Sequence, residues 1–165
     1  MARILIVGGG CRGRQLAAAM TGDGHAVRMT TRTEAGRAAI EAAGAECWIG
    51  TPDRLATLRG ALDNVTVLCW LMGSATGSEE ELSALHGTRL EFFLTQAIDT
   101  TVRGFIYESA GTSTPHELLL EGARRARVLL ERNAIPAAFL AVDPADPAAW
   151  LAQARSAVGS LLAPA

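Results

Sequence analysis

Three glycines and two arginines lie close together in the stretch Ile4–Met20. Gly8, Gly10 and Gly13 form the pattern G-x-G-x-x-G, directly after an apolar run and directly before a helix-like run. In such a turn the first glycine makes the bend and the second lets a pyrophosphate approach the backbone, while the third lets helix and strand pack closely. The pattern therefore predicts a dinucleotide-binding turn.

Arg12 and Arg14 lie where the helix after this turn should begin. The unpaired amides of a helix start carry partial positive charge, so arginine is unfavourable there unless an anion binds. A turn that merely packs leaves both arginines unexplained, whereas a phosphate at the amides explains them. Cys11 is either an oxidation-sensitive thiol or a plain small side chain. We expect Arg12 and Cys11 to line the diphosphate site together with the glycines.

The end of the second predicted strand suggests which dinucleotide is preferred. Domains that prefer NAD usually carry Asp or Glu about 20 residues beyond the turn, but Thr30–Thr33 contains no carboxylate. Thr31 offers a hydroxyl, and Arg32 offers a guanidinium fork suited to phosphate. We therefore expect NADP(H) rather than NAD(H), with Arg32 at the 2′-phosphate and Arg12 or Arg14 assisting. The alternative is that Arg32 is solvated at a strand end.

The segment Cys69–Gly77 follows the fourth predicted strand and should pass beside the cofactor toward its nicotinamide. Gly73 would allow close approach to the cofactor, and Met72 would pack on a ring. Trp70 is either a second ring contact or an ordinary core residue, and the core reading is favoured.

Candidate proton donors lie near the predicted end of the fifth strand: Ser109, Thr112, Ser113, Glu108 and His116. Each lies where the carboxyl ends of the strands bind ligands in such folds. Glu108 alternates with Ser109 along the strand, so at most one of the two faces the site. His116 is either a general acid or a solvated residue at a helix start. His25 and His86 are interpreted as loop and helix-surface histidines.

The composition limits the chemistry that this chain can perform. All fifteen basic residues are arginine, so neither a Schiff base nor a phosphate-loop lysine is available. A net charge of −2 gives no indication of nucleic-acid binding. The three cysteines match no metal-binding spacing and suit a reducing compartment. With no apolar run near ~20 residues and no room for a signal peptide, we expect a cytoplasmic protein without a metal or membrane partner.

Apolar runs and helical patterns alternate along all 165 residues. The predicted strands are Arg3–Val7, Ala26–Thr31, Glu46–Ile49, Val65–Leu71, Gly104–Ser109 and Ala137–Val142. The predicted helices are Arg12–Thr21, Glu34–Ala43, Asp53–Leu62, Glu79–Thr100, Pro115–Asn133 and Pro147–Leu162. This alternation predicts a doubly wound α/β Rossmann fold, a six-stranded parallel sheet of order 3-2-1-4-5-6 with helices on both faces. We expect one domain over residues 1–165, without a separate substrate domain.

Capping signals mark several predicted helix starts. They are Thr114-Pro115 with Glu117, Ser78 with Glu81, Thr51-Pro52, and Asp146-Pro147. Each combines a side chain that accepts from backbone amides with proline or glutamate at a favourable position.

Three further stretches carry a family resemblance: Gly24–Thr33, Val102–Gly111 and Leu129–Pro144. In this order they resemble the second strand, fifth strand and sixth strand of atypical short-chain dehydrogenases/reductases, the NmrA-like and epimerase-like NAD(P)-binding proteins. The resemblance implies a Rossmann fold and a nicotinamide cofactor. It also implies that Ser109 corresponds to the serine-rich segment of the family, which makes Ser109 the favoured hydroxyl to face the nicotinamide and the single catalytic candidate.

The chain departs from that family at its catalytic positions. The family places a tyrosine and, four residues later, a lysine on its fifth helix, where this chain has Leu119 and Ala123. The only tyrosine, Tyr107, lies inside a predicted strand and is interpreted as core or sheet edge. The family's glycine pattern is also G-x-x-G-x-x-G rather than G-x-G-x-x-G, and its arginine-proline after the sixth strand is Asp143-Pro144 here.

Two function classes remain. One is a nucleotide-binding or regulatory protein, a degenerate member of the family that responds to an unidentified small molecule or partner protein. The alternative is a small NADPH-dependent oxidoreductase for a carbonyl-type substrate. Related proteins often dimerise through the fourth and fifth helices, here around Leu90–Ile98 and His116–Asn133. Leu118, Leu119 and Leu120 cannot all face one core, so one of them meets either a partner or a C-terminal segment. Since closed twofold assemblies are the commonest, a homodimer is the expected partner arrangement.

Overall fold

A six-stranded parallel sheet forms the centre of the computed structural model, which describes residues 1–164. The strands are β1 (Arg3–Gly8), β2 (Ala26–Thr31), β3 (Glu46–Ile49), β4 (Val67–Leu71), β5 (Gly104–Glu108) and β6 (Ala137–Leu140). Their order, β3-β2-β1-β4-β5-β6, confirms the predicted topology. Because the winding reverses between β1 and β4, their carboxyl ends form the place where such sheets bind ligands.

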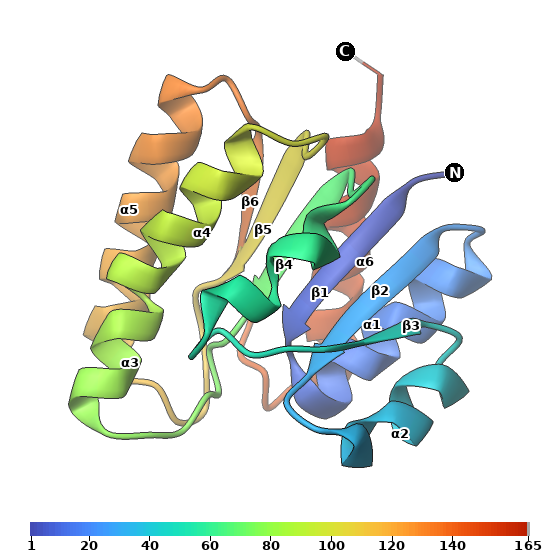
Figure 1. The fold of residues 1–165 in the computed structure, drawn as a ribbon, viewed down its shortest axis with the longest axis horizontal. Helices are drawn as coiled ribbons and strands as arrows, with labels where there is room; N and C mark the ends of the chain where they lie inside the picture. The colour runs from blue at the N-terminus through green and yellow to red at the C-terminus, as the bar shows by residue number, and fades with distance from the viewer. Residues whose placement is uncertain (165) are drawn as a thin grey trace.

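Helices cover both faces of this sheet, as predicted (Figure 1). They are α1 (Gly10–Gly22), α2 (Arg37–Ala42), α3 (Glu79–Leu85), α4 (Thr88–Ile98), α5 (His116–Arg132) and α6 (Pro147–Leu162). Strand β4 is buried on both sides: Leu68 and Trp70 enter the core beneath α4 and α5, whereas Cys69 and Leu71 enter the core beneath α1 and α6. This alternation is why fully buried strands have continuous apolar sequences.

The predicted helix Asp53–Leu62 is wrong. The structure has two short 3₁₀ turns there, Leu55–Thr57 and Arg59–Leu62. The Thr57 hydroxyl donates to the Arg54 carbonyl at 2.6 Å, which offers the backbone a local alternative to the helix. A Cβ on Gly60 would also lie 3.0 Å from the Trp48 ring, so the segment is shaped by close packing against β3.

The predicted helix Glu79–Thr100 is divided into α3 and α4 at Gly87, whose φ of −124° and ψ of −105° are not helical. The break turns His86 inward, where it is 1 % exposed, so its interpretation as a helix-surface residue is wrong. Its Nε2 lies 3.2 Å from the Met72 carbonyl and its Nδ1 lies 2.7 Å from the Tyr107 hydroxyl. A carbonyl only accepts, so Nε2 carries the proton and Nδ1 accepts from the tyrosine.

The capping predictions had mixed outcomes. Ser78 and Glu81 form a full capping box, and the Asp146 carboxylate accepts from the Ala149 amide at 3.1 Å. Thr114 caps nothing: Pro115 is the N-cap of α5, and the Thr114 hydroxyl donates to the Ala75 carbonyl at 3.2 Å. This threonine is buried and ties the loop after β5 to the loop after β4. The Thr51-Pro52 signal likewise begins no α-helix.

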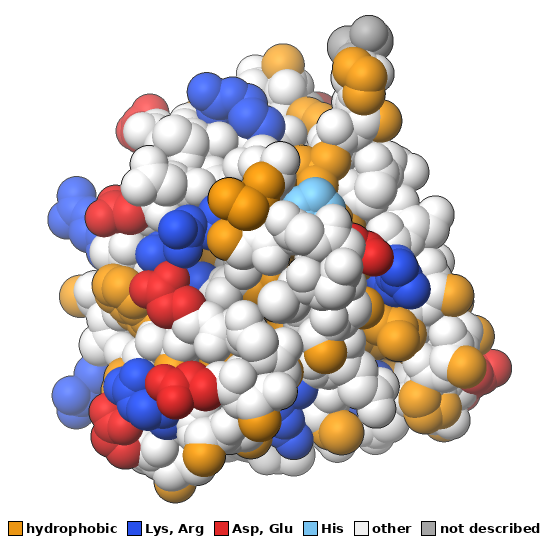
Figure 2. Space-filling view, turned by 90° about the vertical axis from the view of Figure 1, so that its right-hand side faces the viewer, with side chains coloured by type: hydrophobic (Ala, Val, Ile, Leu, Met, Phe, Trp, Pro, Cys, Tyr) orange, Lys and Arg blue, Asp and Glu red, His pale blue; other side chains and the backbone are white. Residues whose placement is uncertain are grey.

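Charges of both signs lie interspersed on the face shown in Figure 2. Near the β2–β3 edge of the sheet, Glu46 pairs with Arg3 at 3.0 Å and with Arg28 at 3.1 Å. No helix among residues 1–164 is long and apolar enough to cross a membrane.

Candidate functional site

The glycine turn joins β1 to α1 at the carboxyl edge of the sheet. Gly8, Gly9 and Gly10 have φ values of +79°, +88° and +52°, a left-handed region that other residues rarely adopt. Gly9 is the N-cap of α1 and has no side chain to accept from the first helical amides. A Cβ on Gly10 would meet nothing within 4 Å, so these amides have open space beside them. This arrangement suits an anion.

Gly13 has the packing role predicted for the third glycine. A Cβ there would lie 2.9 Å from the Met29 side chain and 3.0 Å from the Gly8 carbonyl, which would separate α1 from the sheet. Gly13 lines neither of the two cavities that flank the turn.

Two cavities flank the glycine turn. The β2 cavity has a volume of about 300 Å³, and its lining includes Gly8, Gly10, Arg14, Thr31, Arg32 and Met72. The β4 cavity has a volume of about 250 Å³, and its lining includes Gly8, Gly10, Cys11, Arg12, Met72 and Ser74. Because they share Gly8, Gly10 and Met72, the cavities form one groove across the carboxyl ends of β1, β2 and β4. Seven of the nine predicted cofactor-binding residues line this groove.

At the β2 end of the groove, Arg32 is held by a carboxylate that the sequence did not indicate. Its guanidinium lies 2.9 Å from one oxygen of Asp53, and Arg89 of α4 lies 3.0 Å from the other oxygen. The Thr51 hydroxyl lies 3.3 Å from Asp53 as well. Arg32 is therefore neither free nor simply solvated, and its partner comes from the loop after β3.

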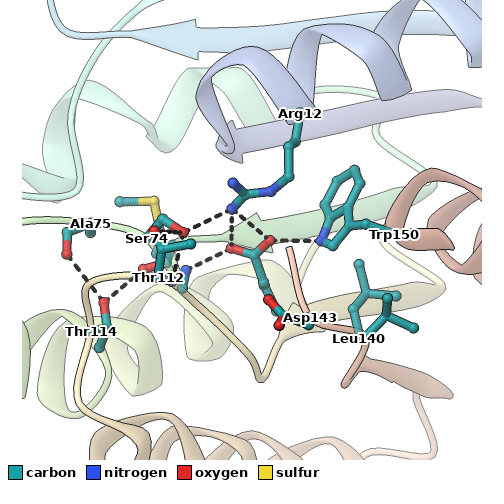
Figure 3. Close-up of polar contacts among 12 residues, drawn as sticks. Arg12, Ser74, Ala75, Thr112, Thr114, Leu140, Asp143 and Trp150 are labelled. Carbon is teal, nitrogen blue, oxygen red and sulfur yellow. Dashed lines mark hydrogen bonds and ion pairs between the residues drawn. The ribbon is translucent and has the colours of Figure 1, made fainter. Parts of the chain in front are cut away.

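At the β4 end, Arg12 turns inward (Figure 3). Its Nη2 donates to the Ser74 hydroxyl at 2.9 Å and lies 3.2 Å and 3.4 Å from the two oxygens of Glu108. The guanidinium also lies over the Trp150 ring, 5.5 Å from its centroid. The anion that offsets Arg12 at the helix start is thus part of the protein. Arg12 and Arg14 do not act as a pair, since Arg14 lines the β2 cavity instead.

Glu108 ends β5 and its side chain has no exposed surface. Besides Arg12, it accepts from the Gly73 amide at 2.8 Å and from the Trp150 indole at 2.9 Å. A carboxylate buried among such donors is stabilised as an anion only because each donor is present. Glu108, weighed from the sequence as a proton donor, is therefore surrounded by groups that donate to it.

The loops after β4 and β5 are bound to each other around Gly73. The Thr112 amide and hydroxyl lie 3.1 Å and 3.0 Å from the Ser74 hydroxyl. A Cβ on Gly73 would lie 2.2 Å from the Ala110 carbonyl. We expected the cofactor to approach Gly73 closely, but the loop after β5 takes that place. Gly73 does not line the groove.

The remaining candidates lie around these loops. The Ser109 hydroxyl donates to the Leu140 carbonyl at 3.0 Å, and Thr112, Ser113 and His116 are exposed. A third cavity, of about 220 Å³, lies beyond β5 and β6 and is lined in part by Thr114, His116 and Asp143. Cys11 is exposed. Within residues 1–164, no group of three or more His, Cys, Asp or Glu could hold a metal ion.

The core residues near the site behave as expected for buried groups. Trp70 and Tyr107 are fully buried, which confirms the core reading of both. Burial lowers the pKa of His86 to about 4, and the bond to the Met72 carbonyl only partly opposes this effect. Burial, together with the nearby Glu108 charge, raises the pKa of Tyr107.

Four residues at the ends of the groove escaped the sequence reasoning: Asp53, Arg89, Ser74 and Trp150. Asp53 was only the first residue of a predicted helix, and Arg89 comes 36 residues later with no motif between them. The one available signal is that Thr30–Thr33 contains no Asp or Glu, so any carboxylate bound to Arg32 comes from another segment.

No protein-family model and no curated protein sequence matches the chain. Solved structures do match its fold. They include a Bacillus halodurans protein assigned as an NAD-dependent epimerase/dehydratase (TM-score 0.70, 18 % identity over 84 % of this chain and 69 % of that one). A UDP-glucuronic acid 4-epimerase mutant from Bacillus cereus with NAD also matches (TM-score 0.64, 14 % identity over 83 % of this chain and 55 % of that one). A Citrobacter triphenylmethane reductase with NADP(H) matches as well (TM-score 0.60, 17 % identity over 83 % of this chain and 48 % of that one).

These similarities show that the chain has the Rossmann-type fold of epimerases and reductases that bind nicotinamide dinucleotides. The chain spans about half the length of the Bacillus cereus epimerase and of the Citrobacter reductase.

Proposed function

We propose that this chain is a nucleotide-binding domain for nicotinamide adenine dinucleotides, with NADP(H) preferred over NAD(H), and that it acts by binding rather than by turnover. The observation that carries this proposal is the glycine turn, because its left-handed glycines lie between two neighbouring cavities that share Gly8, Gly10 and Met72. The topology places this groove where doubly wound sheets bind ligands. The solved epimerase with NAD and the reductase with NADP(H) share the fold.

The residues of the groove fit such a cofactor. The diphosphate lies against the amides beside Gly10 and Cys11, where a Cβ would occupy open space. The adenosine half enters the β2 cavity, where Thr31 and Arg32 meet the ribose and its 2′-phosphate. The bound cofactor would supply hydride chemistry, while these residues bind and orient it.

Two observations support binding without turnover. The chain has no lysine, and the resemblance puts the family's tyrosine and lysine near Leu119 and Ala123, which are buried on α5. In addition, Arg12 is already engaged beside the β4 cavity, because its guanidinium donates to both Glu108 and Ser74. We infer a degenerate member of the short-chain dehydrogenase/reductase family that senses the cofactor or serves a partner.

The alternative is a small NADPH-dependent oxidoreductase for a carbonyl-type substrate. The third cavity favours it, because His116 and Asp143 line a space of about 220 Å³ at the end of β5 and β6. NADPH oxidation with a panel of carbonyl compounds, lost on Ser109→Ala, would establish this function. Binding without oxidation supports the regulatory function.

Calorimetric titration with NADPH and NADH tests the proposed binding. We expect saturable binding of both, tighter for NADPH, and a loss of at least about tenfold on Gly10→Ala because the added methyl enters the diphosphate space. Gly24→Ala is the matched control: Gly24 also has a positive φ and open space around it, but it lies in the turn before β2. Absence of binding in the wild-type protein would disprove the proposal.

The α4–α5 face is the place where we propose a homodimer forms. Phe92, Leu120 and Val128 are exposed there to 58 %, 54 % and 42 %. The mass in solution, measured by light scattering, distinguishes the dimer from a monomer.

A further inference from the structure

Asp53 lies between two guanidiniums at the β2 end of the groove. Its Oδ2 lies 2.9 Å from Arg32 Nη1 and its Oδ1 lies 3.0 Å from Arg89 Nη1, so each carboxylate oxygen faces one arginine. The three residues come from different segments: the loop after β2, the loop after β3, and α4. The Asp53 carboxylate thus holds together Arg32 and Arg89, which lie far apart in the sequence.

The fold itself gains little from this arrangement. The side chains of Arg32, Asp53 and Arg89 are 64 %, 42 % and 31 % exposed. Ion pairs at such exposure are weak, because water and salt screen the charges. Breaking them therefore costs little, and either arginine can exchange the carboxylate for another anion.

The surroundings provide space for that exchange. An outer cavity of about 350 Å³ is lined by Arg32, Asp53, Arg89 and Glu81, among others. Arg32 also lines the β2 cavity, so the two spaces share this residue. The other carboxylate, Glu81, is already bound to the Ser78 amide in the capping box at 3.1 Å.

We propose that Asp53 is a built-in substitute for the 2′-phosphate, and that Arg89 is a second phosphate contact beside Arg32. A 2′-phosphorylated nucleotide takes the place of the Asp53 carboxylate between the two guanidiniums, and the carboxylate rotates into solvent. A phosphate suits this position, since it carries more charge than a carboxylate and has enough oxygens to accept from both arginines. The inference rests on the proposed function and names residues that set its NADP(H) preference.

Competition within the protein then adjusts the affinity for one cofactor only. NADPH has to displace Asp53 and then lies near its negative charge, whereas NADH has no phosphate at this position. Removing the Asp53 charge should therefore strengthen NADPH binding, and removing the Arg89 charge should weaken it. Neither change should alter NADH binding.

The test compares NADPH with NADH by calorimetry at low salt in the full chain. We expect Asp53→Asn to tighten NADPH binding by about fivefold and Arg89→Gln to weaken it by about fivefold, with NADH within about twofold in both. Asp23→Asn and Arg155→Gln are the matched controls, because this pair is also exposed (41 % and 49 %) and joined at 2.9 Å, but it joins the end of α1 to α6 away from the groove.

Three results would overturn the inference. If both cofactors bind but their affinity ratio stays within twofold in Asp53→Asn and Arg89→Gln, the inference fails and the proposed function stands. If Asp53→Asn weakens NADPH binding, the carboxylate positions Arg32 rather than competing for it, and the inference also fails. If the wild-type protein binds neither cofactor, both proposals fail.

Discussion

The two ends of the groove each hold an arginine against a carboxylate, but in opposite environments. At the β2 end, the side chains of Arg32 and Asp53 are 64 % and 42 % exposed. At the β4 end, those of Arg12 and Glu108 are 19 % and 0 % exposed. The same pair of chemical groups is thus easily separated at one end and bound into the core at the other.

The difference follows from desolvation. An exposed carboxylate that loses its arginine regains water, so the exchange is nearly neutral. Glu108 has no access to water, and its other partners, the Gly73 amide and the Trp150 indole, are also buried. Separating Arg12 from it leaves a buried carboxylate without its counter-charge. We infer that the β2 end is suited to exchanging anions and the β4 end to holding the loops in place.

The strongest test of this comparison is to delete each carboxylate. We expect Glu108→Ala to lower the free energy of unfolding by about 3–5 kcal/mol, because it leaves the buried Gly73 amide and Trp150 indole without an acceptor and Arg12 without its counter-charge. Asp53→Ala should change it by no more than about 0.5 kcal/mol. Urea denaturation of the two variants measures both. Equal effects would show that the two ends do not differ.

The loss of stability in acid tests the role of buried His86, which bonds to the Met72 carbonyl beside the β4 cavity. Burial lowers the pKa of His86 to about 4 in the folded protein, against 6.5 when it is free. The unfolded chain therefore binds a proton as the pH falls below about 6.5, whereas the folded protein does not until about pH 4. The free energy of unfolding is therefore not reduced by His86 above pH 6.5. We expect it to fall by about 2–3 kcal/mol on acidification to pH 4.

Denaturation midpoints between pH 4 and pH 7 measure this loss in the wild-type protein and two variants. His86→Gln should flatten the dependence, whereas Tyr107→Phe should keep it because the imidazole stays buried. If the pH dependence of stability is unchanged in His86→Gln, groups other than His86 cause it.

A smaller effect is expected from adding a methyl group where the two loops meet. Gly73→Ala places a Cβ 2.2 Å from the Ala110 carbonyl and should cost about 1–3 kcal/mol. Gly159→Ala is the control: it lies within α6 with nothing within 4 Å, so it should stabilise by about 0.5–1 kcal/mol. Thermal melting compares the two. If Gly73→Ala melts like the wild-type protein, the loops are not held rigidly.

Local sequence determines the parts of this molecule that were predictable. Alternating apolar runs gave the strand order, and the spacing of Gly8, Gly10 and Gly13 gave the turn that opens the groove. Contacts between distant residues determine what was missed. Arg12 and Glu108 lie 96 residues apart, and no spacing rule connects them. The buried position of His86 likewise involves a distant residue, since its imidazole bonds to Tyr107, which lies 21 residues later in β5.

Trp150 gives the buried end of the groove its own optical signal. Its indole is fully buried, donates to Glu108 at 2.9 Å and lies beside the Arg12 guanidinium. Fluorescence of such a ring shifts to longer wavelength when water reaches it. Emission from this tryptophan, read in a background with Trp48→Phe and Trp70→Phe, would therefore report in real time whether the β4 end opens, without any attached dye.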